Sequence, residues 1–458
     1  MFGVTRLGHI VPKQSNEVEK DYFGIGLEKL DRDLYRPDKV YDKLQCIGVK
    51  LVRIQSGWAK TESNAGVYDF SWLDDIVDNL VTRGMEPWIC LCYGNPVYTD
   101  GAKDAFGAVN HPPVKTKAEK DAWVRYCLKV VERYREKVNK YEIWNEPDWL
   151  WYPGGNGVEY GDFALMTAKA IKEAYPDTYL IAGSLTHLDA QWVEDMFSTG
   201  LAQYTDGVTY HRYSAYVEKI LQDIVPVQEV LKKYGVRDLI QGESGCQSQP
   251  FGAGAVWEGA WDEVKQTKIL LRRELIDLMT QVRFSSYFTS VDVREALVNV
   301  VGQAYFGILR NKFDADGKVT GEYEEKPSYY AFCNFISLFD GEFKLCALNV
   351  DYVPAWSLKY YREDEDGKDF ITQGFVRNNG ASAFAYYKPT QVMTTSYEST
   401  VSFRISGVTG EPRLIDPYDG GIYSFDEDKL ELADGVYHFK NIPVKDYPLV
   451  LTFGDFII

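Results

Sequence analysis

The sequence has 458 residues, of which 45% are hydrophobic and 26% are charged, and this composition excludes a disordered or collagen-like chain. Its formal net charge of −17 opposes binding to nucleic-acid phosphates and to anionic lipid headgroups. No apolar run approaches the roughly 20 residues of a membrane span, and the first residues lack the apolar core of a signal peptide. Seven widely spaced cysteines indicate buried thiols in a reducing compartment rather than a disulfide framework or a zinc site. We therefore expect a cytoplasmic globular protein.

Residues 20–340 alternate short apolar, strand-like runs with amphipathic stretches of helical period. Eight such runs predict a closed (β/α)8 TIM barrel of the α/β class. An open, doubly wound sheet is the alternative, but its usual glycine-rich first turn is missing. The expected strands are 23–30, 50–56, 87–93, 141–145, 179–183, 207–213, 239–243 and 283–290. The expected helices include 71–83, 117–138, 162–174, 217–234, 264–279 and 327–339.

Residues 341–458 lose the helical period and instead show short β-rich runs separated by turn residues. This pattern predicts a C-terminal antiparallel β-sandwich, to which residues 1–19 add an edge strand. No low-complexity linker separates the two parts, so we expect them to pack directly. The β-rich runs include AWSLKYY, ITQGFVR, SAFAYYK, TVSFRI, GVYHF and YPLVLTF.

Two of the expected barrel strands end in a carboxylate, and the active site of a parallel barrel lies at these strand ends. Glu146 ends the fourth run within WNEP, and Glu243 ends the seventh within GESG. Two carboxylates facing one pocket suit retaining glycoside hydrolysis, in which one attacks the anomeric carbon and the other protonates the leaving oxygen. The alternative for either residue is a structural ion pair with an arginine. Glu142 lies inside the fourth run, so we expect it to point outward or to pair with a base such as Arg53.

With these motifs the sequence resembles the retaining glycoside hydrolases of clan A, whose barrels carry an Asn-Glu acid/base on strand four and a Glu nucleophile on strand seven. The resemblance implies that Glu146 is the acid/base and Glu243 the nucleophile. Arg53, on the second run, matches the arginine that supports the nucleophile. His211 and Tyr213, on the sixth run, match the His-x-Tyr pair that contacts it, with core packing as the alternative for both.

Within the clan, the segment SGWAKTESNAGVYDFSWLDDIVDNL resembles families 39 and 42. The motif FGIL…KPSYYAF and the order of barrel before sandwich are more similar to family 39.

Aromatic side chains are expected around the site, because their faces suit the C–H faces of a sugar. The clan commonly ends strand eight with a Trp beneath the sugar, whereas this run reads Ser286-Tyr287-Phe288-Thr289. The resemblance implies that Tyr287 or Phe288 takes that place. Other aromatics follow the expected strands and are predicted to stack on sugar, with loop packing as the alternative: Trp58, Tyr98, Trp149, Trp151 and Tyr152.

Together these features predict a retaining glycosidase that cleaves a β-xyloside, β-glucoside or β-galactoside, with Asn145 bound to the sugar 2-hydroxyl. A catalytically silent carbohydrate-binding or scaffold barrel is one alternative, and a transglycosylase that uses the same residues is another. The chemistry requires no metal and no cofactor. A carbohydrate is the expected partner, nucleic acid and membrane partners are not expected, and a homo-oligomer stays open.

Overall fold

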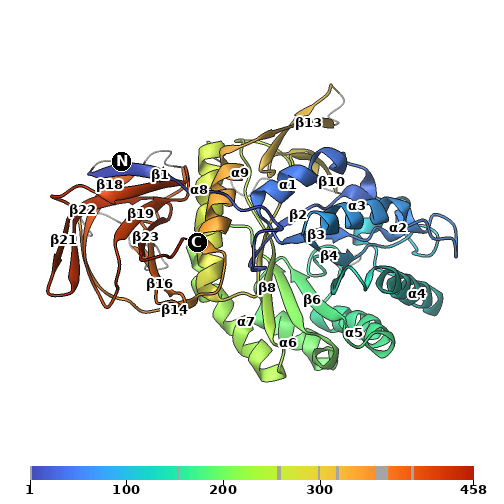
Figure 1. Ribbon diagram of the computed structural model, residues 1–458. Coiled ribbons are helices and arrows are strands. Elements are labelled where there is room, and N and C mark those ends of the chain that lie inside the picture. Colours follow the sequence, from blue (N-terminus) through green and yellow to red (C-terminus); the bar gives the residue numbers. More distant parts are fainter. Residues whose placement is uncertain are drawn as a thin grey trace.

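The computed structural model describes residues 3–151, 154–254, 259–297, 300–315, 319–355, 370–393 and 397–457. A closed barrel of eight parallel strands, ringed by helices, adjoins two antiparallel sheets (Figure 1). The predicted (β/α)8 barrel followed by an antiparallel C-terminal part is confirmed.

Each of the eight expected runs contributes one barrel strand. The barrel closes where the last strand pairs in parallel with both the first strand and the seventh. The strands are β2 (Phe23–Gly26), β3 (Leu51–Gln55), β4 (Glu86–Leu91), β5 (Lys140–Ile143), β6 (Tyr179–Leu185), β7 (Gly207–His211), β8 (Asp238–Ser244) and β9 (Ser285–Tyr287).

The first and last barrel strands, β2 and β9, are much shorter than predicted, and two hairpins follow β9. β2 stops at Gly26 because Lys29 has a left-handed backbone (φ 71°) and begins a 3-10 turn. Between β9 and the final helix the chain forms the hairpins β10–β11 and β12–β13, which βα alternation alone does not predict. Their strands are β10 (Val293–Leu297), β11 (Val300–Ala304), β12 (Leu309–Phe313) and β13 (Val319–Glu325).

Four of the helices, α4, α5, α6 and α8, begin at a side chain that accepts a hydrogen bond from a free backbone N–H group. Thr116 accepts from the N–H of Glu119, and Asn156 accepts from that of Glu159. Because Asn156 caps it, the helix expected at residue 162 already begins at Gly157. The helices are α1 (Tyr41–Ile47), α2 (Trp58–Thr61), α3 (Ser71–Thr82), α4 (Lys117–Tyr134), α5 (Gly157–Ala174), α6 (Ala190–Ser198), α7 (Ile220–Tyr234), α8 (Glu263–Thr280) and α9 (Pro327–Phe339).

The C-terminal part consists of a seven-stranded sheet, in the order β1-β20-β19-β23-β17-β16-β14, and a four-stranded sheet, in the order β15-β18-β22-β21. β1 (Val4–His9) joins the larger sheet by antiparallel pairing with β20. Most of the run AWSLKYY lies outside the described residues, and the domain boundary at residue 340 stays a prediction. The other strands are β14 (Lys344–Cys346), β15 (Asn349–Pro354), β16 (Ile371–Val376), β17 (Ser382–Tyr387), β18 (Glu398–Ser406), β19 (Pro412–Asp416), β20 (Gly421–Phe425), β21 (Leu430–Ala433), β22 (Val436–Lys445) and β23 (Leu449–Phe453).

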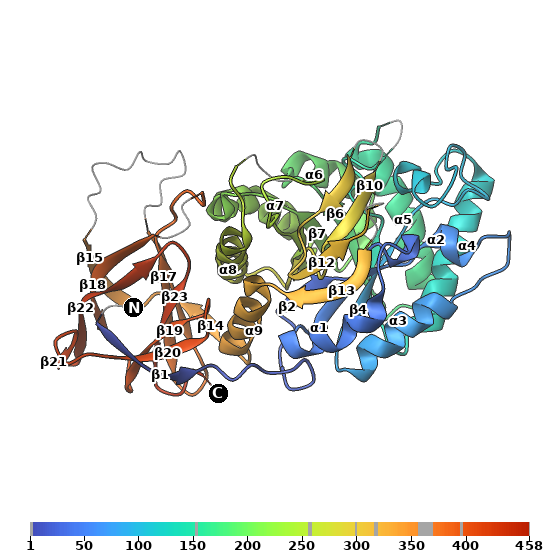
Figure 2. The same ribbon diagram turned by 90° about the horizontal axis from the view of Figure 1, so that it is seen from above.

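α8 and α9 lie on the side of the barrel that faces these sheets (Figures 1 and 2). The position of α8 between the two parts explains why it is buried nearly all round, its lysines and arginines included. Lys268 on α8 forms a buried ion pair of 2.8 Å with Asp446, which follows β22. Among the described helices, none combines the length and the apolar character needed to cross a lipid bilayer.

Candidate active site

A cavity of about 430 Å³ opens at the C-terminal ends of the barrel strands. Side chains that follow β2, β5, β7, β8 and β9 line it, which is where a TIM barrel holds its chemistry. Six residues predicted from the sequence line this cavity: Asn145, Glu146, Trp149, Tyr213, Glu243 and Phe288.

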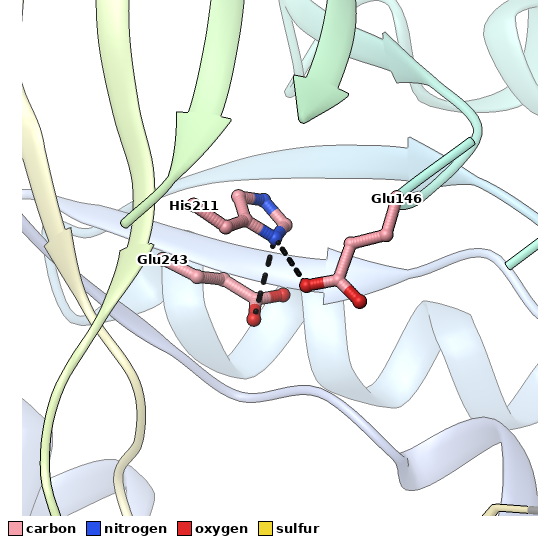
Figure 3. Close-up of side chains that lie close together, drawn as sticks. All are labelled: Glu146, His211 and Glu243. Atoms are coloured by element: carbon pink, nitrogen blue, oxygen red, sulfur yellow. Dashed lines mark hydrogen bonds and ion pairs between the residues drawn. The ribbon is translucent and has the colours of Figure 1, made fainter. Parts of the chain in front are cut away.

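Glu146 and Glu243 face one another across His211 (Figure 3). Nδ1 of His211 lies 2.9 Å from Oε1 of Glu146 and 3.5 Å from Oε2 of Glu243. One oxygen of Glu146 and one of Glu243 lie within 4.8 Å of each other. The predicted acid/base, the predicted nucleophile and the predicted histidine therefore form one cluster.

The backbone around Glu146 turns sharply after β5. Trp144 (φ 69°) and Glu146 (φ 50°) both adopt the left-handed conformation, which L-residues with a side chain rarely adopt. The Glu146 N–H donates to the carbonyl of Ser184 on β6 (3.0 Å), and the indole N–H of Trp144 donates to the carbonyl of Leu150 (3.1 Å). The surrounding contacts thus hold a strained turn that presents the Glu146 carboxyl to the cavity.

Arg53 lies fully buried beneath the two carboxylates and contacts three acids. Its guanidinium donates to Glu243 and to Glu142 on β5, and Nη1 lies 3.4 Å from Oε1 of Glu28. Nη2 also donates to Oδ1 of Asn145 (2.8 Å). Arg53 therefore holds the nucleophile candidate, and it also pairs with Glu142, which is one of the two arrangements expected for that residue.

The environment moves the pKa values of the two carboxyl groups in opposite directions. Burial raises the pKa of Glu146 above its ordinary value, against the opposing effect of His211. Burial would also raise the pKa of Glu243, but the charges of His211 and Arg53 and a 2.8 Å hydrogen bond from the Tyr213 hydroxyl lower it below its ordinary value. Such a pair provides a protonated acid beside an ionised nucleophile at the same pH.

His211 itself is held between carboxylates. Burial would lower its pKa, but the charge of Glu243 and the hydrogen bond to Glu146 raise the pKa above its ordinary value. Its Nε2 lies 3.1 Å from the hydroxyl of Ser184. A protonated imidazole satisfies both contacts by donating from both ring nitrogens.

A divalent cation is a further occupant that the spacing of Glu146, His211 and Glu243 would allow, because their ligand atoms lie within 4.8 Å of one another. The imidazole N–H accounts for the same arrangement as a hydrogen-bond donor between the two acids. That the site works without a metal stays a prediction.

Four predicted sugar-binding aromatics do not line the cavity. Trp58 is fully buried, stacks between Tyr98 and Tyr126, and donates from its indole N–H to Glu62 (2.6 Å). The hydroxyl of Tyr98 donates to the same carboxylate. Because its faces are covered by protein, Trp58 packs the loop rather than a sugar, and Tyr98 belongs to that packing.

Trp151 and Tyr287 likewise pack against protein, which is the alternative for Trp151, and neither lines the cavity. Trp151 packs edge-on against Trp144 and Phe163, and Tyr287 is buried against Phe332 of α9. Of the predicted stacking aromatics, Trp149, which is 55% exposed, and Phe288 line the cavity. Tyr93, Tyr213 and Phe306 line it as well. Tyr152 lies outside the described residues.

Several polar residues of the cavity wall were not predicted from the sequence. Lys29, Arg32 and Gln55 line the cavity, and Gln55 accepts hydrogen bonds from the Lys29 N–H (3.0 Å) and from Arg32 (2.8 Å). Glu28 lies below them, and burial together with the charge of Glu243 raises its pKa to about 7. The one signal for Glu28 and Lys29 was their place at the end of the first expected strand.

Comparison with known proteins gives a family match and partial relatives. The sequence model of glycosyl hydrolases family 39 matches residues 29–258. A β-xylosidase of Caldicellulosiruptor saccharolyticus is 28% identical over 186 residues, which cover 36% of this chain and 37% of that protein. The β-galactosidase BgaA of Clostridium cellulovorans is 37% identical over 73 residues, which cover 16% of this chain and 10% of that protein. The chain thus matches well under two thirds of the length of these relatives.

Solved structures match almost the whole chain. A family 39 glycoside hydrolase from Bacteroides cellulosilyticus superposes with a TM-score of 0.69 at 16% identity, over 97% of this chain and 83% of that one. A monomeric β-xylosidase from Caulobacter crescentus superposes with a TM-score of 0.62 at 15% identity, over 98% and 97%. At these identities the likeness concerns the fold.

Proposed function

The chain belongs to glycosyl hydrolases family 39, and on that premise we propose that it is a retaining glycosidase that hydrolyses β-glycosidic bonds by double displacement. The observation that carries the proposal is the placement of Glu146 and Glu243, with one oxygen of each within 4.8 Å of the other. Retaining enzymes hold their carboxyl groups roughly 5 to 5.5 Å apart, whereas inverting enzymes need roughly 6.5 to 9.5 Å to seat a water molecule.

In the first step Glu243 attacks the anomeric carbon while Glu146 gives its proton to the leaving oxygen. The lowered pKa of Glu243 and the raised pKa of Glu146 support these two roles. The C–O bond to the aglycone breaks as the ester bond to Glu243 forms, and the aglycone leaves with the proton from Glu146.

In the second step Glu146 removes a proton from water, which attacks the same carbon and releases Glu243. Once Glu243 is an ester, its negative charge no longer raises the pKa of Glu146. The Glu146 carboxyl is therefore a weaker acid when it must give its proton and a stronger one when it must be ionised. Two displacements restore the β-configuration.

Asn145 is placed to bind the sugar beside the reacting carbon. Its Oδ1 accepts from Arg53 (2.8 Å), so the amide keeps its N–H donors for the cavity that Asn145 lines. Donation to the sugar 2-hydroxyl would strengthen as the oxocarbenium-like transition state forms.

A neutral sugar remains the proposed substrate, with a β-xyloside first because two of the similar proteins are named β-xylosidases. A β-uronide is a second candidate, because the cations Lys29 and Arg32 line the cavity. Nitrophenyl β-xyloside, β-glucoside, β-galactoside and β-glucuronide tested side by side separate these choices. Turnover of none of them would favour the silent barrel, and transfer of the sugar to an added alcohol faster than to water would favour a transglycosylase.

Two experiments test the roles of the carboxylates. A 2-deoxy-2-fluoro glycosyl fluoride of the preferred sugar should add one sugar mass to the peptide that contains Glu243, and labelling at Glu142 or Glu146 would contradict the assignment. Glu146→Gln should slow poor leaving groups far more than activated aryl glycosides, because an activated group needs little protonation. Equal losses for both substrate types would remove Glu146 from the acid role. Independently of these two experiments, a first product in the α-configuration would indicate inversion.

A further inference from the structure

Two adjacent arginines on α8, Arg272 and Arg273, are both about 1% exposed and yet serve different parts of the molecule. Arg272 donates to the carbonyls of Asp446 and Thr390, both in the C-terminal part. Arg273 donates instead to the carbonyl of Arg212, the residue that follows β7. Arg272 also lies 3.6 Å from Glu218, which precedes α7, so it links the sandwich to the barrel, whereas Arg273 contacts the end of β7.

The Arg212 carbonyl lies at the end of β7, next to two residues that contact Glu243. It lies between His211 and Tyr213, whose side chains both reach Glu243. It also accepts a hydrogen bond of 3.2 Å from the hydroxyl of Ser244, the residue after Glu243. Arg273 and Ser244 thus donate to the same carbonyl, and this carbonyl joins the end of β7 to the end of β8.

The surroundings of Arg273 are polar where a barrel normally packs apolar side chains against its helices. Tyr210, Gln241 and Ser285 are register partners across β7, β8 and β9 and share the outer face of the barrel. Ser285 donates to Asp277 on α8 (2.8 Å), and Asp277 lies 3.6 Å from Nη1 of Arg273.

The guanidinium of Arg273 uses only part of its hydrogen-bonding capacity. Among the described residues, Nε and Nη1 of Arg273 have no hydrogen-bond partner. A buried guanidinium with incomplete hydrogen bonding is less favourable than a well-packed aliphatic side chain of similar size. We therefore look for a role of Arg273 other than stability in its hydrogen bond to the Arg212 carbonyl.

We propose that Arg273 is a positioning residue of the active site: from α8 it holds the Arg212 carbonyl and thereby aims His211 and Tyr213 at Glu243. The kinetic test of this role rests on the proposed function, because it measures glycoside hydrolysis. The charged and titratable groups that face Glu243 come from several elements, namely Glu28, Lys29, Arg53, Glu146, His211 and Tyr213. Of these, His211 and Tyr213 directly flank the anchored carbonyl.

The kinetic test compares Arg273→Met with the wild type over a range of pH. Without the anchor, His211 and Tyr213 lower the pKa of Glu243 less, so the acid limb of kcat/KM should move to higher pH by about half a unit to one unit. Misplaced groups should lower kcat by about tenfold and leave KM nearly unchanged. Arg273→Lys keeps a donor and should recover most of both effects.

Arg272→Met is the matched control, because it removes an equally buried arginine from the next position of the same helix. It should lower the melting temperature, because it removes two hydrogen bonds to the sandwich and the ion pair with Glu218, and it should leave the acid limb in place. If Arg273→Met shifts the melting temperature alone, as Arg272→Met does, Arg273 has only a structural role and the proposal is wrong.

Ser244→Ala provides a second test that leaves α8 intact, including the case in which Arg273→Met does not fold. It should move the acid limb in the same direction by a smaller amount, and the double variant should show less than the sum of the two shifts. Additive shifts, or no shift in Ser244→Ala, would overturn the common role of the Arg212 carbonyl.

A measurement without substrate separates this proposal from the proposed function. The chain has five histidines, so the imidazole NMR signals of His211 can be assigned by comparison with His211→Gln. Since Glu243 and Glu146 raise the pKa of His211, this pKa should fall in Arg273→Met and stay unchanged in Arg272→Met. A fall in a protein that hydrolyses no glycoside would support the positioning role and refute the activity, and an unchanged pKa would refute the positioning role.

Discussion

The barrel interior has two layers built from the same strands: an apolar layer around Leu51 and Ile240, here called the floor, and a charged layer around Arg53 and Glu243, here called the mouth. β3 places Leu51 in the floor and Arg53 in the mouth, and β8 places Ile240 in the floor and Glu243 in the mouth. The floor is a separate apolar cluster in which Leu51, Ile240, Trp88, Ile181 and Phe284 are at most 1% exposed. These residues come from opposite sides of the barrel and can meet only inside it.

The mouth, by contrast, gathers ionisable groups that resist burial. Glu28, Glu142 and Glu243 surround one arginine, and desolvation of such groups opposes folding even when they are paired. The guanidinium of Arg53 lies 5.3 Å above the ring of Trp88, so the apolar layer directly supports the charged one. Along each of these strands, the residues that pack the apolar floor therefore lie only two or three positions before the residues proposed for the chemistry.

Glu243→Gln makes the sharpest test of the mouth. We expect kcat/KM for an aryl glycoside to fall by at least about 10⁴-fold, or ~5.5 kcal/mol, because an amide cannot take the proposed role of nucleophile. The free energy of unfolding should fall only slightly, because the lowered pKa of Glu243 means that the fold favours its charged form, while Arg53 keeps its ion pair with Glu142. Kinetics and urea denaturation measure the two effects, and a large loss of stability would show that the charged layer also holds the fold.

Ile240→Ala makes the opposite test in the floor. Truncation of this buried side chain should lower the free energy of unfolding by about 2 to 5 kcal/mol, because a cavity remains where the side chain was. Below the melting temperature of the variant, kcat/KM should stay within about threefold of the wild type, since the reacting groups lie one layer above. A loss of activity without a loss of stability would contradict the separation of the two layers.

Glu28 and Asp416 provide a matched pair, one in the mouth and one on β19 of the sandwich. Burial raises the pKa of each carboxyl to about 7, so the folded state keeps a proton that the unfolded state has already lost. The free energy of unfolding should therefore fall as the pH rises from the ordinary pKa of an acid to about 7. Glu28→Gln and Asp416→Asn should each remove about 1 to 3 kcal/mol of this fall between pH 5 and 7.5.

Chemical denaturation of the wild type and both variants at the two pH values checks the effect. A variant whose stability falls as steeply as that of the wild type would show that its carboxyl is ionised in the fold at pH 5.

The sequence predicts those features that repeat or that end a regular element. Apolar runs at βα spacing identify the eight strands, and Glu146 and Glu243 lie at the cavity because the ends of parallel strands meet at one face. Lys29 enters the cavity wall through a left-handed turn that shortens β2, and the hairpins after β9 interrupt the alternation. These depend on loop conformation, which leaves no period in the sequence.

The sequence also does not predict which individual aromatic side chains are buried. Trp58 and Trp149 both follow a barrel strand, and nothing local distinguishes them. Trp58 is covered by Tyr98, which comes from a loop 40 residues further along the chain, and only tertiary packing decides this.

Replacing Trp149 and Trp58 in turn makes the mildest test, at the rim of the mouth. Trp149 is 55% exposed and lines the cavity, so Trp149→Ala should raise KM about fivefold, which is ~1 kcal/mol, and leave kcat nearly unchanged. Trp58→Phe removes the N–H donor to Glu62 and should lower the free energy of unfolding by about 1 to 3 kcal/mol without changing KM. Steady-state kinetics on one aryl glycoside and a thermal melt of each variant separate the two roles. A raised KM in Trp58→Phe would indicate that Trp58 contacts the sugar after all. A ring covered on both faces can affect binding only if the loop opens and exposes it.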